Sequence, residues 1–236
     1  MLGLKQTASH WSRSKIVSWY TSGPRLPAMV TPRLNDAQQK LYNNIVDSRI
    51  NIVGKEALFD KQGGLRGPWN PEVASPALGQ HLERLGDAVR HENSLEARLY
   101  EIAILVVSVH WKAQFEWFAH EKLARKAGVA EAAFPLIKAG VTAKDLVDVL
   151  QADEVAVYKL SLELMETKRV SAETFAETKE ALGGDDQKMA DLCMTMGCYS
   201  AVSKLLNMFE IGLPEGEPLP FPELPSNPHS ASKPNV

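Results

Sequence analysis

The sequence predicts an all-α protein, and three observations support that prediction. Hydrophobic residues recur at three- and four-residue spacing over most of residues 35–210, which is the period of a helix with one buried face. No stretch alternates convincingly between hydrophobic and polar residues, as a half-buried strand would. Residues that favour helix ends, such as Asn35, Ser75 and Gly128, separate the periodic stretches.

The first part of the chain is expected to hold two helices and a long loop. One helix begins after Asn35, a plausible N-cap, and ends near Arg49. Residues 60–75 are dense in Gly and Pro, which favours a loop. Ser75 then caps a helix with Pro76 at its first position, where the missing N–H costs nothing. The apolar residues that recur along this helix are Leu78, Leu82, Leu85 and Val89.

The most hydrophobic helix of the chain is expected to begin at Ser94. It is apolar nearly all round as far as Val109, which predicts a place at the centre of a bundle. A further helix is expected from about Lys112 to Ala127, ending at Gly128. The remaining helices are expected near residues 130–139, 143–168, 171–182 and 185–210.

The composition suits one globular domain. The chain has 236 residues, of which 44% are hydrophobic and 23% are charged. Both ends make poor core material, so one helical domain is expected over residues 35–212. A net charge of −3 without a clustered basic face argues against nucleic-acid binding. No apolar run reaches the length of about 18 residues that a membrane span needs.

Cysteine and histidine are too few and too scattered to predict a metal or redox site. Cys193 and Cys198 lie five residues apart, which is neither a CxxC pair nor a zinc-binding pattern. We expect both to be small core residues, in a protein of a reducing compartment. No metal site and no cofactor are expected, because no ligand spacing, Gly-rich phosphate loop or serine nucleophile elbow occurs.

The two ends differ from the helical middle. Residues 1–34 are rich in Ser and Thr and contain Lys and Arg but no acid, which is typical of a mitochondrial import sequence. A disordered tail, or an extension ahead of a start at Met29, is the alternative. The expected location is cytoplasmic, with mitochondrial as the alternative. Residues 213–236 hold seven of the 14 prolines, as in a flexible tail or an arm against a neighbouring subunit.

Three residues of the central helices are candidates for an acid/base site. Glu101 is a carboxylate inside an otherwise hydrophobic helix, and burying an ionised group is costly unless it is paired. Glu116 and His120 lie one turn apart on the next helix and therefore share a face. Burial raises the pKa of a carboxylic acid and a nearby carboxylate raises that of a histidine, so the pair could exchange a proton near neutral pH.

Each of these residues also has a purely structural explanation. Glu101 could pair with Arg98 or Arg125, and Glu116 with His120 could be a surface pair worth a few tenths of a kcal/mol. The explanations differ in geometry, because only an active site requires all three side chains to meet within hydrogen-bond reach in a closed pocket.

Three aromatic or imidazole side chains are further candidates for substrate binding. Trp69 stands in the Gly- and Pro-rich segment 67–71, which could line the site or only plug the core. His110 ends the central helix, where the helix macrodipole also explains a histidine. Trp117 stands beside Glu116 on the next helix.

The two predicted helices that carry Glu101, Glu116 and His120 also resemble a known protein family. The segment from Glu101 to Gly128, with the loop 67–69 and the helix over 78–86, resembles the carboxymuconolactone decarboxylase family, which includes the alkylhydroperoxidase D group. The resemblance covers residues 36–212, and its most specific part is the spacing of positions 101, 113, 116 and 120. Peroxidase members carry cysteines at the two middle positions. Ala113 and Glu116 stand there in this chain, so peroxidase chemistry is not expected.

The resemblance implies an alkylhydroperoxidase D-like helical bundle and a homo-oligomer, a trimer or hexamer. It implies a decarboxylase, a carbon–carbon lyase that acts without a cofactor on a small carboxylated lactone or cyclic acid. Protonated His120 would protonate the carbanion, Glu116 would set its tautomer and charge, and Glu101 would relay or balance the proton. Arg98 or Arg66 would bind the substrate carboxylate.

Two other functions remain open on the same fold. One is an isomerase or cyclase that uses the same acid/base residues, and the other is a non-catalytic oligomeric binding protein. The chain is longer than the small decarboxylases at both ends, and a fold does not by itself fix a chemistry. Release of carbon dioxide separates the decarboxylase from both alternatives.

Overall fold

The computed structural model describes residues 24–221, and this part of the chain is all-α, as predicted. Outside the helices, the described residues form one isolated β-bridge, between Phe59 and Leu65. The helices are α1 (Asp36–Val53), α2 (Lys55–Leu58), α3 (Trp69–Ala74), α4 (Pro76–His91), α5 (Ala97–Trp111), α6 (Gln114–Ala127), α7 (Ala133–Ala139), the 3₁₀-helix η1 (Ala143–Leu146), α8 (Ala152–Thr167), α9 (Ala172–Ala181) and α10 (Asp186–Met208).

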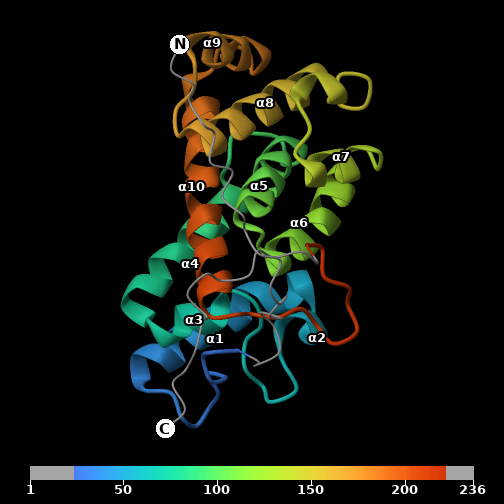
Figure 1. Ribbon diagram of the computed structural model, residues 1–236. Coiled ribbons are helices and arrows are strands. Elements are labelled where there is room, and N and C mark those ends of the chain that lie inside the picture. The colour runs from blue at the N-terminus through green and yellow to red at the C-terminus, as the bar shows by residue number, and fades with distance from the viewer. Residues whose placement is uncertain (1–23, 222–236) are drawn as a thin grey trace, which may run out of the picture.

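Helix α5 lies at the centre of the molecule, as its composition predicts (Figure 1). It packs against α6, α8 and α10, while α4 packs against α10 on one side and against α1 and the short helix α3 on the other. Helices α8 and α9 lie at one end of the long helix α10, and α1 to α3 lie at the other (Figure 1). The side chains of residues 101–108 in α5 are buried all round, so this helix has no face left for solvent.

Within the described residues, the hydrophobic interior is divided into three clusters. The largest surrounds α5 and includes the fully buried side chains of Ile102, Leu105 and Trp117. A smaller cluster joins α1 to the segment 58–73. The third lies around Val202 and Leu206 of α10.

Two expected elements differ from the structure. Residues 60–75 were expected to be a loop but contain the short helix α3. Proline is compatible with a first helical turn because its missing N–H has no partner there, and both Pro68 and Pro71 stand at this start. The helix expected over 143–168 is broken into η1 and α8, because capping boxes at Thr142 and Gln151 start two separate helices.

Side-chain placement also corrects three sequence predictions. Helix α5 begins at Ala97, and Ser94 instead donates its hydroxyl to Asp191 at 2.6 Å. Along α4, Leu78 is 74% exposed and only Val89 is fully buried, because the helix packs along a narrower stripe than its leucines suggest. Cys193 is exposed and only Cys198 is a core residue, since the two lie on different faces of α10.

Segments on both sides of the expected helical domain contact it. Arg25 donates its backbone N–H to the carbonyl of Phe209, and Met29 donates its own to the Asn70 side chain. At the other end, Gln114 of α6 both donates to and accepts from the backbone of Phe221, at 2.6 and 2.8 Å. The proposed import segment and most of the Pro-rich tail fall on residues 1–23 and 222–236, outside the described residues.

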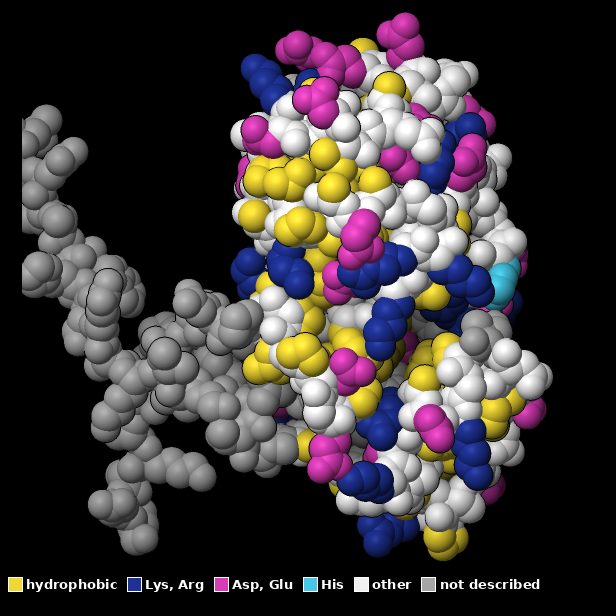
Figure 2. All heavy atoms as spheres, turned by 90° about the vertical axis from the view of Figure 1, so that its right-hand side faces the viewer, with side chains coloured by type: hydrophobic (Ala, Val, Ile, Leu, Met, Phe, Trp, Pro, Cys, Tyr) yellow, Lys and Arg dark blue, Asp and Glu magenta, His cyan; other side chains and the backbone are white. Residues whose placement is uncertain are grey.

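The surface carries mixed charges. On the face in Figure 2, Lys and Arg side chains are interspersed with Asp and Glu, and hydrophobic side chains gather between them. Among the described helices, none combines the length and the apolar character that crossing a membrane requires.

Candidate active site

A tight connection between α5 and α6 brings the predicted acid/base residues together. Helix α5 ends at Trp111, Lys112 adopts the left-handed conformation with φ of 50°, and α6 begins at Gln114. The two helices therefore pack against each other along their length. This hairpin places Glu101 of α5 beside His120 of α6.

Glu101 and Glu116 both approach His120 closely, which is one part of the geometry that the active-site explanation requires. His120 Nδ1 lies 2.7 Å from Glu101 Oε2, and His120 Nε2 lies 3.2 Å from Glu116 Oε1. The second contact is close enough for an ion pair, but its direction does not satisfy a hydrogen bond. Glu101, Glu116 and His120 are 3%, 2% and 5% exposed, so this is not a surface pair.

The two carboxylates keep the imidazole charged. Burial is the largest influence on His120 and by itself lowers its pKa, but the charge and hydrogen bond of Glu101, with help from Glu116, raise the pKa to about 10. The imidazolium is therefore the resting form at neutral pH. Glu116 stands in the first turn of α6, where the positive end of the helix dipole also favours a carboxylate.

His120 and Glu116 line a cavity of about 120 Å³ formed by five helices. Helices α1, α3, α4, α6 and α10 each contribute to its wall, and most of the wall is apolar. The volume is below the roughly 300 Å³ at which drug-sized ligand sites begin, so the cavity suits a small ligand. Glu101 does not line the cavity and lies behind His120.

Two arginines line the same cavity, and they differ in how they are paired. Arg49 is 2% exposed and forms salt bridges with Glu83 at 2.7 Å and Asp87 at 2.9 Å. Arg90 forms no salt bridge with any described residue and only approaches the Tyr199 hydroxyl, at 3.5 Å. Of the two arginines, Arg90 is therefore the one that has no salt bridge with a described residue and can bind an anionic group.

Glu72 is a cavity residue that the sequence reasoning missed. It lies on α3, inside the stretch predicted to be a loop, and is 3% exposed. Burial, supported by the charges of Glu83 and Glu116, raises its pKa to about 8 even though Arg49 and Arg90 oppose the shift. The only sequence signal was an acid between proline and valine in a short segment with hydrophobic neighbours.

The close approach of α4 to α3 fixes Glu72 at the cavity. A Cβ atom at Gly79 would lie 2.2 Å from the backbone oxygen of Glu72, so only glycine fits there. The loop before α3 is held in a similar way. Gly67 has φ of +62°, and a Cβ there would lie 2.6 Å from the ring of Phe115.

The other sequence candidates are divided between the cavity and distant positions. Trp69 lines the cavity, as one of its two explanations requires. Trp117 is fully buried elsewhere, where its indole N–H donates to Glu121 and its ring packs edge-on against Phe221. His110 is exposed at the end of α5 and lines a different hollow.

Neither arginine suggested for the substrate carboxylate lies at this cavity. Arg98 forms a two-pronged salt bridge with Asp153, at 2.6 and 2.9 Å, because its side chain extends toward α8. Arg66 donates to the carbonyl of Phe59 within its own loop. Arg90 lines the cavity in which Arg98 or Arg66 was expected.

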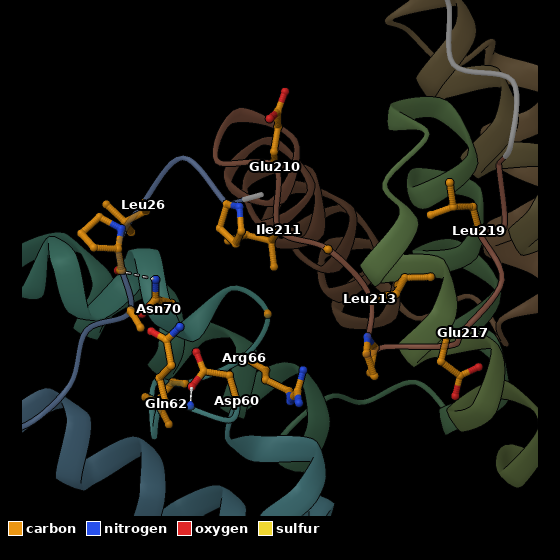
Figure 3. Close-up of a pocket in the computed structure, with 17 residues that line it drawn as sticks. Leu26, Asp60, Gln62, Arg66, Asn70, Glu210, Ile211, Leu213, Glu217 and Leu219 are labelled. Carbon is orange, nitrogen blue, oxygen red and sulfur yellow. Dashed lines mark hydrogen bonds between the residues drawn. The ribbon is translucent and has the colours of Figure 1, made fainter. Parts of the chain in front are cut away.

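A larger hollow lies elsewhere, and several of its polar groups already have partners within the chain (Figure 3). It measures about 570 Å³ and lies between residues 24–28, the loop 60–67 and residues 210–219. Asn70 donates to Pro27, and Asp60 accepts from the backbone of Gln62 and Gly64. These contacts stabilise the chain's own loops, so the smaller cavity is the better candidate site.

No protein-family model matches the chain, and a search of curated proteins also finds no match. Among residues 24–221, no three His, Cys, Asp or Glu side chains are grouped so that they could hold a metal ion.

Proposed function

We propose that this protein is a cofactor-independent decarboxylase, a carbon–carbon lyase that acts on a small carboxylated lactone or cyclic acid. The observation that carries the proposal is His120, held as an imidazolium between two buried carboxylates in the wall of a cavity that an unpaired arginine also lines. This arrangement supplies an acid and an anion-binding group at one place. The family resemblance of the α5–α6 segment supports the same reaction and an alkylhydroperoxidase D-like fold.

Arg90 would bind the carboxylate that is lost. Its guanidinium has no salt-bridge partner among the described residues, and arginine binds carboxylates with two parallel hydrogen bonds. The small, largely apolar cavity would leave little room for water beside the carboxylate, which would strengthen the electrostatic interactions inside. The bond to carbon dioxide then breaks, and its electron pair moves toward a conjugated carbonyl of the substrate.

His120 would deliver the proton that replaces carbon dioxide. Glu116 lines the cavity and Glu101 does not, so Nε2 is the nitrogen on the cavity side. Glu101 accepts a hydrogen bond from Nδ1, and so it is Glu101 that fixes the orientation and charge of the ring. Glu116 stands next to the transferable proton.

The test is carbon dioxide release over a panel of carboxylated lactones and β-keto acids. His120→Ala is expected to lower kcat by at least about 100-fold, the lower end of what a positioned general acid contributes. His81→Ala is the matched control, because His81 is exposed on α4 and does not line the cavity. Far-ultraviolet circular dichroism checks that each variant is folded.

Two results would contradict this function. Release that is equal in His120→Ala and in the unmodified protein would remove the imidazolium from the reaction. No release from any substrate, with substrate consumed and rearranged, would favour the isomerase or cyclase that uses the same residues. We further propose a small-molecule carboxylate as the substrate and a homo-oligomer, trimer or hexamer, as the assembly, which light scattering would measure.

A further inference from the structure

Glu72 carries a carboxyl oxygen that has no partner. Its Oε2 is buried and accepts or donates no hydrogen bond within residues 24–221, although the side chain lines the cavity. An unpartnered buried polar atom costs about 1–3 kcal/mol, so native proteins seldom leave one without a reason. The cavity provides that reason, because a ligand inside it can supply the missing partner.

The groups around Glu72 come from every helix that forms the cavity. Arg49 faces it from α1, and Glu83 and Arg90 from α4. Helix α6 contributes Glu116 and His120, and α10 contributes Cys198 and Tyr199. Burial and the neighbouring carboxylates outweigh the arginines, so Glu72 carries its proton at neutral pH.

A neutral carboxylic acid differs from the arginines and the imidazolium of the site, because it can donate a hydrogen bond without adding charge, as the Tyr199 hydroxyl of the same cavity also can. Arg90 is a cation for an anionic group, while protonated Glu72 suits an oxygen that gains negative charge only during the reaction. The two groups lie in one small cavity, so they can contact a single small ligand at two points.

We propose that Glu72 donates a hydrogen bond to the carbonyl oxygen that takes up the electron pair, so the cavity selects carboxylates with a carbonyl at the β position. The proposal rests on the proposed function and names its substrate class. Glu72 becomes a catalytic residue beside His120, and Arg90 and Glu72 together define the spacing between the carboxylate and the carbonyl.

The reaction balances with the groups present. The bond between the α-carbon and the carboxylate breaks and releases carbon dioxide, and its electron pair forms the double bond of an enolate. The enolate oxygen is stabilised by the Glu72 hydrogen bond. When the carbonyl re-forms, the α-carbon takes a proton from His120, which then recovers one from solvent. The sum is one β-keto carboxylate and one proton giving one ketone and carbon dioxide, without an oxidant or reductant.

The experiment compares Glu72→Leu and Glu72→Gln in the full chain, with β-keto acids such as acetoacetate and with carboxylated lactones as probes. Loss of one preorganised donor costs about 100-fold in kcat, which is the expected fall for Glu72→Leu. Glu72→Gln keeps an N–H donor, and its fall is expected to be smaller, about 10-fold. Glu154→Gln, a buried carboxyl on α8 away from the cavity, is the matched control and should retain kcat.

The pH profile separates this role from a structural one. In the unmodified protein kcat should fall as pH rises through about 8, where Glu72 loses its proton, and this fall should be absent in Glu72→Gln. If His120→Ala is inactive while Glu72→Leu retains kcat and the alkaline fall, this inference is overturned and the decarboxylase stands. Release only from carboxylates without a β-carbonyl also overturns it. Release from no substrate overturns both.

Discussion

Helix α5 takes part in two clusters of charge one turn apart, a partly exposed one around Arg98 and a buried one around Glu101, and they are built in opposite ways. Near its start, Arg98 is surrounded by Glu96, Asp153 and Glu154, all within salt-bridge distance. One turn later, Glu101 contacts His120 in the wall of the cavity. Three carboxyl groups line that cavity, and Arg90 is its only arginine without a salt bridge to a described residue.

This difference in pairing separates the cluster around Arg98, which is structural, from the groups at the cavity, which can react. Asp153 forms two hydrogen bonds with Arg98, which lower its pKa and raise that of the guanidinium, so both groups are locked in their charged forms. At the cavity, Glu72 has a raised pKa and a buried oxygen that forms no hydrogen bond with any described residue. Glu154 Oε1 also lacks a hydrogen bond, but it lies within salt-bridge distance of Arg98. Groups that can still change protonation state are the ones available for chemistry.

The largest expected effect comes from breaking the structural cluster. Arg98→Leu leaves the buried carboxylate of Glu154 and the partly exposed one of Asp153 without their cation, and a buried charge left without its partner costs about 3 kcal/mol or more in the free energy of unfolding. Urea unfolding measures the change. Arg84→Leu, on the exposed side of α4, should change it by less than about 0.5 kcal/mol. If both variants lose the same free energy of unfolding, the salt bridges of Arg98 do not stabilise the fold.

Substitution of Glu72 at the cavity should change the free energy of unfolding in the opposite direction, toward greater stability. The folded-state pKa of Glu72 is raised from 4.5 to about 8, so its contribution to stability is present below pH 4.5 and is lost as pH rises through about 8. His120 acts in the same direction between its ordinary 6.5 and about 10. Glu72→Gln should therefore be more stable than the unmodified protein at pH 9, by about 1–3 kcal/mol.

Urea unfolding at pH 5 and pH 9 measures this contrast. Glu72→Gln should lose less stability between the two values than the unmodified protein, because one of the two titrating groups is gone. Glu154→Gln should instead be less stable at both values, since Glu154 is 2% exposed and pairs with Arg98. A destabilised Glu72→Gln at pH 9 would show that Glu72 is held by contacts like those of the Arg98 cluster.

The smallest expected effect is on thiol reactivity. Burial is the main cause that raises the pKa of Cys198 to about 12, and Glu116 adds to it. A disulfide reagent should therefore modify Cys193, which is exposed, rapidly and Cys198 only after unfolding. Glu116→Gln should make Cys198 slightly more reactive, and Cys193 serves as the internal control. Rapid modification of both thiols in the folded protein would place Cys198 in an open, less anionic site.

The helices and the acid/base residues Glu101, Glu116 and His120 could be predicted from the sequence because both depend on local spacing. Glu116 and His120 share a face wherever the helix that holds them lies, and Glu101 is conspicuous in a hydrophobic helix. Their meeting point follows from the short connection between α5 and α6, which leaves these helices few ways to pack.

The sequence did not predict Glu72 and Arg90 because their role depends on how α3 and α4 pack against α6 and α10. Short helices carry too few residues for a period to be visible, so the Gly- and Pro-rich context of α3 predicted a loop. Arg98, one of the two cations expected from the sequence, does not line the cavity. Its partner Asp153, 55 residues away, turns its side chain from the site, and spacing along the chain contains no signal of that.

The contact between Gly79 and the backbone of Glu72 has a consequence for how such a sequence can diverge. Any side chain gained at position 79 must push α3 aside and carry the carboxyl at 72 with it. A side chain at position 79 is therefore expected to alter the cavity without contacting it. A chain keeps this acid in this place only if it has both a glutamate and, seven residues later, a glycine.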